Sequence, residues 1–213
     1  MSFKKDLISG FSKRNKIIPS KYHYDLQGSK YFEKITKQKE YYPTKKEKEI
    51  LLKVSKEIPK LFKGNLSFVE LGSGAADKIK ILINKKVKFY IPLDISLDFV
   101  KNSVKNLKKK HKNIKIKPTK IDYSKNFKIP NFKKTTKVYF FLGSSIGNFH
   151  NKEEVNFLKK LKKSIGKNNY LFIGADLIKN KKVLNNAYND KKGYTAKFSL
   201  NLINIINRTQ KTK

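Results

Sequence analysis

The chain has 213 residues and a formal net charge of +35, from 51 Lys and Arg against 16 Asp and Glu. It contains no cysteine, which excludes disulfides, thiolate metal ligands and cysteine nucleophiles. The length allows one sizeable core with an accessory helical layer. No apolar run reaches the roughly 18 residues that a membrane span needs, and the N-terminus does not resemble a secretory signal. These features predict a cytoplasmic protein without membrane contact.

The positive charge makes nucleic-acid binding an alternative to consider, because counterion release draws any polycation to a polyanion. Only Arg14 and Arg208 are arginines, although arginine is the residue that reads guanine and phosphate with two hydrogen bonds. The lysines are spread over the whole chain rather than gathered in one segment. We therefore expect no specific nucleic-acid partner.

Residues 44–62 predict an amphipathic helix. Thr44 and Glu47 have the spacing of a capping box, and Pro59 is expected to bend or end the helix. The expected apolar face consists of Ile50, Leu51, Val54, Ile58 and Leu61.

Five predicted strands follow, at residues 67–72, 88–94, 113–121, 137–142 and 170–178. Helices are expected from about Asp77, from Ser96 through Leu107, and over a segment with Val155, Leu158, Leu161 and Ile165 on one face. Strands that alternate with helices predict an α/β, Rossmann-like protein. Its mostly parallel sheet would have helices on both faces and right-handed crossovers.

A glycine turn follows the first predicted strand. The strand runs into Gly72-Ser73-Gly74, and Asp94 ends the next strand about twenty residues later. Glycine allows a ligand to approach the backbone closely, and an acidic residue at the end of the second strand is placed to bind ribose hydroxyls. This arrangement predicts an adenosine cofactor.

The residues after the turn favour S-adenosylmethionine over a dinucleotide. Asp77 stands where a dinucleotide fingerprint needs a third small residue. A carboxylate there would repel a pyrophosphate, whereas S-adenosylmethionine has no phosphate and carries a positive sulfonium. Methyl transfer is therefore a better prediction than hydride transfer.

Several polar residues follow predicted strands, and the carboxyl ends of parallel strands share one edge of a sheet. They are Gly72, Asp94, Asp122, the loop 143–148 and Asp176. Each alone could be a turn residue or a helix cap, but together they predict one pocket. The three histidines, His23, His111 and His150, have no metal-ligand spacing and are expected to be solvated or structural.

Longer segments resemble a known family, the histidine-specific N-methyltransferases of ergothioneine biosynthesis. The resemblance rests on residues 22–25, 28–29, 35–36, 40–44, 69–74, 92–94, 141–148, 174–177, 187–190, 193–201 and 207–208. Its most specific segments are Glu40-Tyr41-Tyr42-Pro43-Thr44 and Phe141-Leu142-Gly143-Ser144-Ser145-Ile146-Gly147-Asn148.

The resemblance implies roles for individual residues. Those expected to contact S-adenosylmethionine are Gly72, Lys78, Asp94, Asp122 and Tyr123. Those expected to contact the amino acid are Tyr41, Asn148 and Tyr188. Transfer from a sulfonium requires an aligned neutral amine, so neither a general base nor a metal is assigned. The implied reaction methylates the α-amino group of histidine to give its trimethylated betaine, hercynine. The alternatives are another acceptor amino acid, a basic nucleic-acid-binding protein, and an inactive remnant of the family.

The resemblance also divides the chain. Residues 1–62 would form the N-terminal helical part of a substrate lobe, 63–180 the S-adenosylmethionine-binding domain, and 181–213 the start of a second, incomplete part of the lobe. The family continues for about a third of its length beyond this chain, which leaves open whether the chain is active alone. The apolar strand at 170–175 would then have a bare edge, through which we expect self-association.

Overall fold

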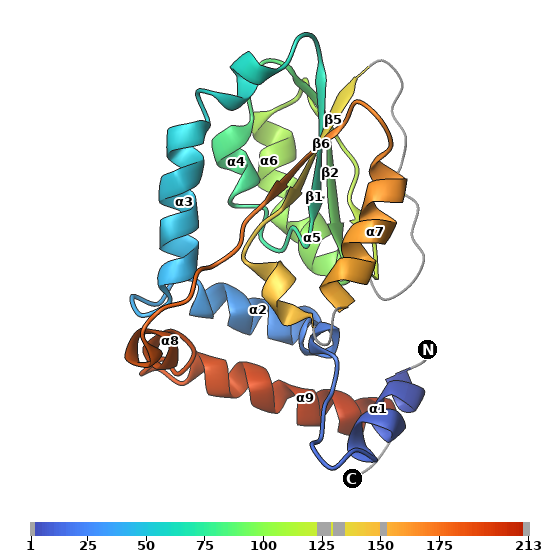
Figure 1. Cartoon of the computed structure of the whole chain (residues 1–213), viewed down its shortest axis with the longest axis vertical. Coiled ribbons are helices and arrows are strands. Elements are labelled where there is room, and N and C mark those ends of the chain that lie inside the picture. Colours follow the sequence, from blue (N-terminus) through green and yellow to red (C-terminus); the bar gives the residue numbers. More distant parts are fainter. Residues whose placement is uncertain (1–2, 123–128, 130–134, 150–152, 211–213) are drawn as a thin grey trace.

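The computed structural model describes residues 3–122, 129, 135–149 and 153–210. Its centre is a sheet of six strands (Figure 1): β1 (Leu66–Leu71), β2 (Val87–Asp94), β3 (Lys115–Ile116), β4 (Thr119–Lys120), β5 (Thr136–Phe141) and β6 (Tyr170–Ile173). The order is β3-β2-β1-β5-β6, with β4 also paired to β2, and all strand pairs among the described residues are parallel. The predicted Rossmann-like architecture is confirmed.

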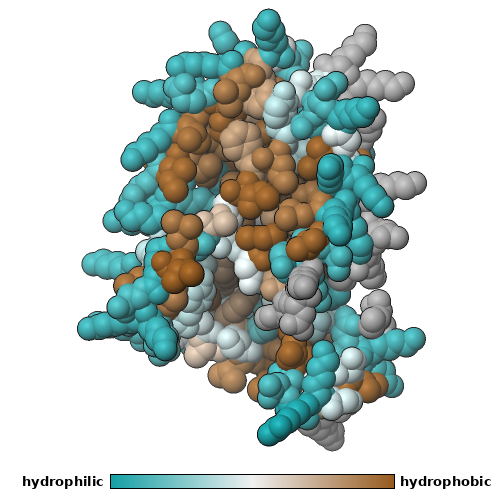
Figure 2. Space-filling model, in the orientation of Figure 1, coloured by the Kyte–Doolittle hydropathy of each residue, from teal (hydrophilic) through white to brown (hydrophobic). Residues whose placement is uncertain are grey.

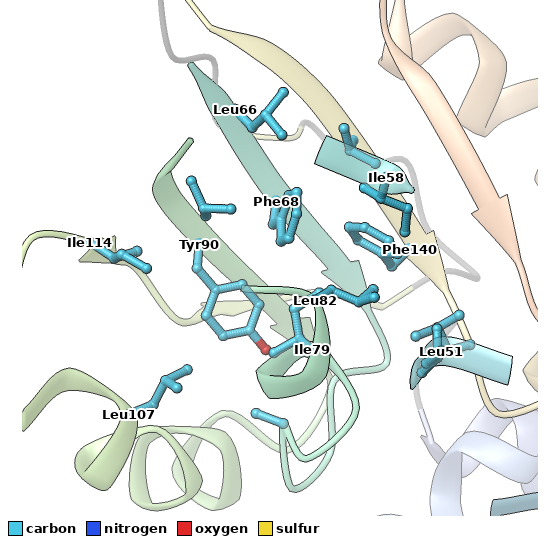
Figure 3. Packing of buried hydrophobic residues seen from close by; sticks show 14 of the residues in the cluster. Leu51, Ile58, Leu66, Phe68, Ile79, Leu82, Tyr90, Leu107, Ile114 and Phe140 are labelled. Atoms are coloured by element: carbon cyan, nitrogen blue, oxygen red, sulfur yellow. The ribbon is translucent and has the colours of Figure 1, made fainter. Parts of the chain in front are cut away.

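Helices cover both faces of the sheet. One face carries α3 (Tyr42–Val54), the 3₁₀ helix η2 (Ile58–Leu61), α4 (Ile79–Leu82), α5 (Leu97–Ser103) and α6 (Lys105–Lys110). There Leu51 and Ile58 join Phe68, Tyr90 and Phe140 of the strands in the larger core cluster (Figure 3). The other face is covered by α7 (Glu153–Ile165) through Phe157 and Leu161.

A helical layer lies across the carboxyl ends of the strands (Figure 1). It consists of α1 (Phe3–Phe11), the 3₁₀ helix η1 (Ser20–His23), α2 (Leu26–Ile35), α8 (Lys181–Ala187) and α9 (Tyr194–Gln210). Asp25 ties this layer together, because its carboxylate accepts hydrogen bonds from Gly28 N (2.7 Å), Asn201 Nδ2 (2.9 Å) and Arg208 (2.8 Å). Segments from the two ends of the sequence thereby form one body.

The predicted helix at 44–62 differs most from the structure. It begins at Tyr42 with Pro43 in its first turn, so the capping box of Thr44 and Glu47 is wrong. Proline is well suited to the first turn because its missing N–H would have no helical partner there. The helix ends at Val54, and only the short η2 follows around Pro59. Of the expected apolar face, Ile50 and Leu61 are exposed.

Three other elements differ from the prediction. The helix from Ser96 divides at Val104 into α5 and α6. The strand at 113–121 becomes β3 and β4 on either side of Pro118, which has no N–H to donate to a ladder. The strand at 170–178 ends at Ile173, because the chain turns away after Gly174 and the Asp176 amide donates to Ser144 Oγ (2.9 Å).

β6 is an edge strand with exposed apolar side chains, as expected of a bare edge. Tyr170 and Ile173 are 50% and 41% exposed, and Leu177 and Ile178 beyond them are exposed as well. Figure 2 shows an apolar area at the centre of this face, where Figure 1 draws β6 in front. Within the described ranges, no helix combines the length and apolar character that crossing a membrane requires.

Candidate functional site

The glycine turn holds Asp94 at the carboxyl edge of β1 and β2. Gly72 and Gly74 have φ values of +69° and +49°, a region that favours glycine. The two Asp94 carboxylate oxygens accept hydrogen bonds from the backbone N–H groups of Gly74 and Ser96, both at 2.9 Å. Burial raises the pKa of Asp94, against the lowering effect of these N–H groups. A Cβ at Gly74 would meet no atom within 4 Å, so there is open space beside the turn.

Glu70 lies just before this turn and is buried in β1. The Tyr90 hydroxyl donates a hydrogen bond to its carboxylate. Burial raises the pKa of Glu70 to about 8, although Tyr90 and Lys78 act in the opposite direction. Glu70 therefore holds its proton to a higher pH than an exposed glutamic acid does.

Lys78 is paired with an acidic residue that the sequence analysis assigned to a helix cap. The Lys78 ammonium lies 2.5 Å from Glu47 Oε2, and the Gly143 amide donates to Glu47 Oε1 at 2.6 Å. Glu47 thus joins α3 to the turns after β1 and β5. A sequence signal existed, because Glu47 precedes Leu51 by one helical turn and therefore shares its buried face.

Two of the predicted amino-acid-binding residues are neighbours. Tyr41 is buried at the N-terminus of α3, and its ring meets that of the half-exposed Tyr188 edge to face, with centroids 5.8 Å apart. Burial, followed by the proximity of Tyr188, raises the pKa of Tyr41 far above its usual value. Burial also raises the pKa of Tyr188. Both phenols are therefore neutral at neutral pH.

Tyr24 is a further tyrosine of this group, and the sequence analysis gave it no role. Its ring packs edge to face on Phe32 and Phe198. Burial, then the proximity of Asp94 and Tyr188, raises the pKa of Tyr24 to about 12. The Tyr24 hydroxyl is therefore within electrostatic range of both Asp94 and Tyr188. Its only sequence signal was its place in the segment 22–25 of the family resemblance.

The remaining predicted residues lie around the same rim. Asp122, just after β4, accepts a hydrogen bond from Lys21 of η1 (3.3 Å). Asn148 is exposed at the end of the 3₁₀ helix η3 (Ser145–Asn148). Asp176, after β6, accepts hydrogen bonds from Tyr42 and Lys179. Tyr123 lies outside the described residues.

The two histidines that the structure describes, His23 and His111, belong to different elements. The His23 ring stacks on Phe198, with centroids 5.2 Å apart, and His111 ends α6. His150 is not among the described residues. In the part of the chain that the structure describes, no three His, Asp or Glu side chains form a group that could hold a metal ion.

A family model described as "Histidine-specific methyltransferase, SAM-dependent" matches residues 3–213. The chain is 31% identical over 214 residues to a histidine N-alpha-methyltransferase of Mycobacterium tuberculosis. The alignment covers 98% of the chain and 66% of the relative. It is 32% identical over 192 residues to ergothioneine biosynthesis protein 1 of Neurospora crassa, covering 86% of the chain and 22% of that protein. The chain therefore spans about two thirds of the length of the mycobacterial relative.

A solved structure from Methanococcus maripaludis, assigned as an S-adenosyl-L-methionine-dependent methyltransferase, is similar with a TM-score of 0.50. The sequences are 17% identical, and the likeness covers 94% of this chain and 85% of the other. At this identity the likeness concerns the fold.

Proposed function

Because the chain belongs to the family of histidine-specific, S-adenosylmethionine-dependent methyltransferases, we propose that it methylates the α-amino group of histidine. Three successive transfers would give trimethylated histidine, hercynine. The fold is that of the Rossmann-like class I methyltransferases. The observation that carries the proposal is the geometry at the carboxyl edge of the sheet, where the glycine turn holds Asp94 and where Tyr41 and Tyr188 pack against each other in the helical layer.

The glycine turn and Asp94 fit an adenosine cofactor with a positive charge. Open space lies beside Gly74, and each Asp94 oxygen keeps a lone pair for a ribose hydroxyl. Asp94 brings to this rim of a chain whose net charge is +35 a carboxylate that is held by backbone N–H groups, and such a group favours a sulfonium over a phosphate. The residues that we propose hold the cofactor are Gly72, Lys78, Asp94, Asp122 and Tyr123.

We assign Tyr41, Asn148 and Tyr188 to the amino acid and add Tyr24 to this group. Neutral phenols and a carboxamide can orient an amino acid through hydrogen bonds without fixed charge. When bound, S-adenosylmethionine would supply an electrophilic methyl group and keep the C–S electron pair on its sulfur. The protein residues would align the neutral amine with that carbon, and the first and second transfers would each release one amine proton to water.

The proposal predicts binding of S-adenosylhomocysteine by the chain and conversion of histidine to its trimethylated form. Binding is measured by titration calorimetry, and methylation by mass spectrometry of histidine incubated with S-adenosylmethionine. Because the chain spans 66% of the mycobacterial relative, the methylation assay is run twice. One assay contains the chain alone, and the other also contains the remaining part of that relative as a separate polypeptide.

The two halves of the proposal can fail separately. Lack of S-adenosylhomocysteine binding by the folded chain would contradict the assigned cofactor. Binding without methylation of histidine in either assay would contradict the assigned acceptor. Tryptophan and lysine, tested in parallel, show whether another amino acid takes its place.

We also propose that the chain self-associates through β6. An edge strand presents unpaired backbone groups, and apolar side chains beside it favour association with another chain. Light scattering is expected to give a mass above the 24.8 kDa of the monomer. Ile173→Lys, which places a charge on this edge, should restore the monomer, whereas Ile203→Lys on α9 should not. A wild-type monomer at the same concentration would contradict the proposal.

A further inference from the structure

We infer that Glu47 is a positioning residue that holds Lys78 and the loop 143–148 in place for the cofactor and the amino acid. The inference rests on the proposed function and extends it to a residue on a different element. One Glu47 oxygen lies 2.5 Å from Lys78 Nζ, and the other accepts from Gly143 N at 2.6 Å. The Glu47 side chain is 14% exposed and that of Lys78 is 22% exposed, so water competes little for either group.

Two glycines leave the room that this arrangement needs. A Cβ at Gly174 would lie 2.2 Å from Glu47 Oε1, and a Cβ at Gly143 would lie 2.8 Å from Lys78 Nζ. Any larger residue at 174 would push the carboxylate away from the Gly143 amide, and one at 143 would move the ammonium. Glu47 and Lys78 therefore occupy a site shaped by the turns after β5 and β6.

The position of Glu47 on α3 connects it to the tyrosines. Tyr41 is the N-terminal flanking residue of the same helix, about 9 Å from Glu47 along the helix axis. A shift of α3 would move Tyr41 and Glu47 together. Through Glu47 the shift would also move Lys78 and the loop that carries Asn148. This single side chain thus aligns the residues proposed for the cofactor with those proposed for the amino acid.

Substitutions at Glu47 separate its two contacts. In Glu47→Gln an amide oxygen can still accept from Gly143, but the charge beside Lys78 is lost. Glu47→Ala removes both contacts. Because Lys78 then loses a charged partner, we expect S-adenosylhomocysteine to bind about tenfold more weakly to Glu47→Gln and weaker still to Glu47→Ala. Glu49→Gln is the matched control, since Glu49 lies on the same helix, its side chain is 42% exposed, and it forms an ion pair with the exposed Lys46.

Hydrogen exchange tests the positioning role without any ligand. Glu47→Ala should lower the protection of the Gly143 amide in the free chain, Glu47→Gln should retain part of it, and Glu49→Gln should leave it unchanged. Equal protection in all three variants would overturn the inference, as would equal S-adenosylhomocysteine affinity in Glu47→Gln and Glu49→Gln. If the wild-type chain binds no S-adenosylhomocysteine while Glu47→Ala exposes Gly143, the proposed cofactor is wrong and the positioning role stands.

Discussion

Asp94→Ala is expected to weaken the binding of S-adenosylhomocysteine at least thirtyfold. The variant removes two charge-assisted hydrogen bonds that we propose for the ribose, a loss of about 2–4 kcal/mol. It also removes the carboxylate that accepts from Gly74 and Ser96, so the glycine turn loses its fixed position. Titration calorimetry of the wild type and the variant measures the ratio of the two affinities.

Two controls accompany this measurement. Asp98→Ala removes an exposed carboxylate on α5, close in sequence but paired only loosely with Lys101 at 3.7 Å, and should bind with the affinity of the wild type. Circular dichroism establishes that the Asp94 variant is folded. A folded Asp94→Ala that binds as tightly as Asp98→Ala would remove Asp94 from the site.

Gly28→Ala should destabilise the chain by about 3 kcal/mol or more, at the upper end of what overpacking costs. A Cβ at Gly28 would lie 1.7 Å from the carbonyl oxygen of His23, and backbone cannot yield as a flexible side chain does. Alanine is normally favoured over glycine within a helix by about 1 kcal/mol, so the clash reverses the usual sign. The η1 segment must move, and Tyr24 directly after it would lose its packing against Phe32 and Phe198.

Thermal unfolding tests this expectation. For a chain of this size the loss corresponds to a fall in Tm of about 6–12 °C, and S-adenosylhomocysteine should bind more weakly as well. Gly147→Ala is the control for Tm alone, since it lies in the loop 143–148 of the candidate site. Its Cβ would have one neighbour within 4 Å, Ser144 Oγ at 4.0 Å, and its φ is not left-handed. A Tm for Gly28→Ala at or above that of the wild type would show that η1 and α2 are not packed as described.

The central strands were predictable because their signals lie in adjacent residues. The apolar runs of β1, β2 and β5 were each placed within a residue or so of their observed ends. A strand buried on both faces must be continuously apolar, and a glycine turn with an acidic residue one strand later follows from local backbone geometry. The positions of Gly72 and Asp94 at the carboxyl edge of the sheet could therefore be predicted from the local sequence.

The sequence was less informative where two local signals compete. Thr44 and Glu47 matched a capping box, yet Pro43 is accommodated in the first turn and the helix begins at Tyr42. The break at Val104 interrupts a continuous apolar period. In both places the packing of the helix against the sheet determines where it begins and ends, and a periodic pattern alone does not contain that information.

Contacts between distant residues were decided only by the tertiary structure. Glu47 meets Gly143 across 96 positions of sequence, and Asn201 meets Asp25 across 176. Composition, motif spacing and family resemblance predicted the class of fold and the glycine turn, and they proposed most residues of the candidate site. They could not bring Tyr24 within electrostatic range of Asp94 or pair Glu47 with Lys78. Those contacts form when α3 and the helical layer pack against the sheet. That packing depends on apolar surface buried between distant segments of the chain, so no local segment determines it.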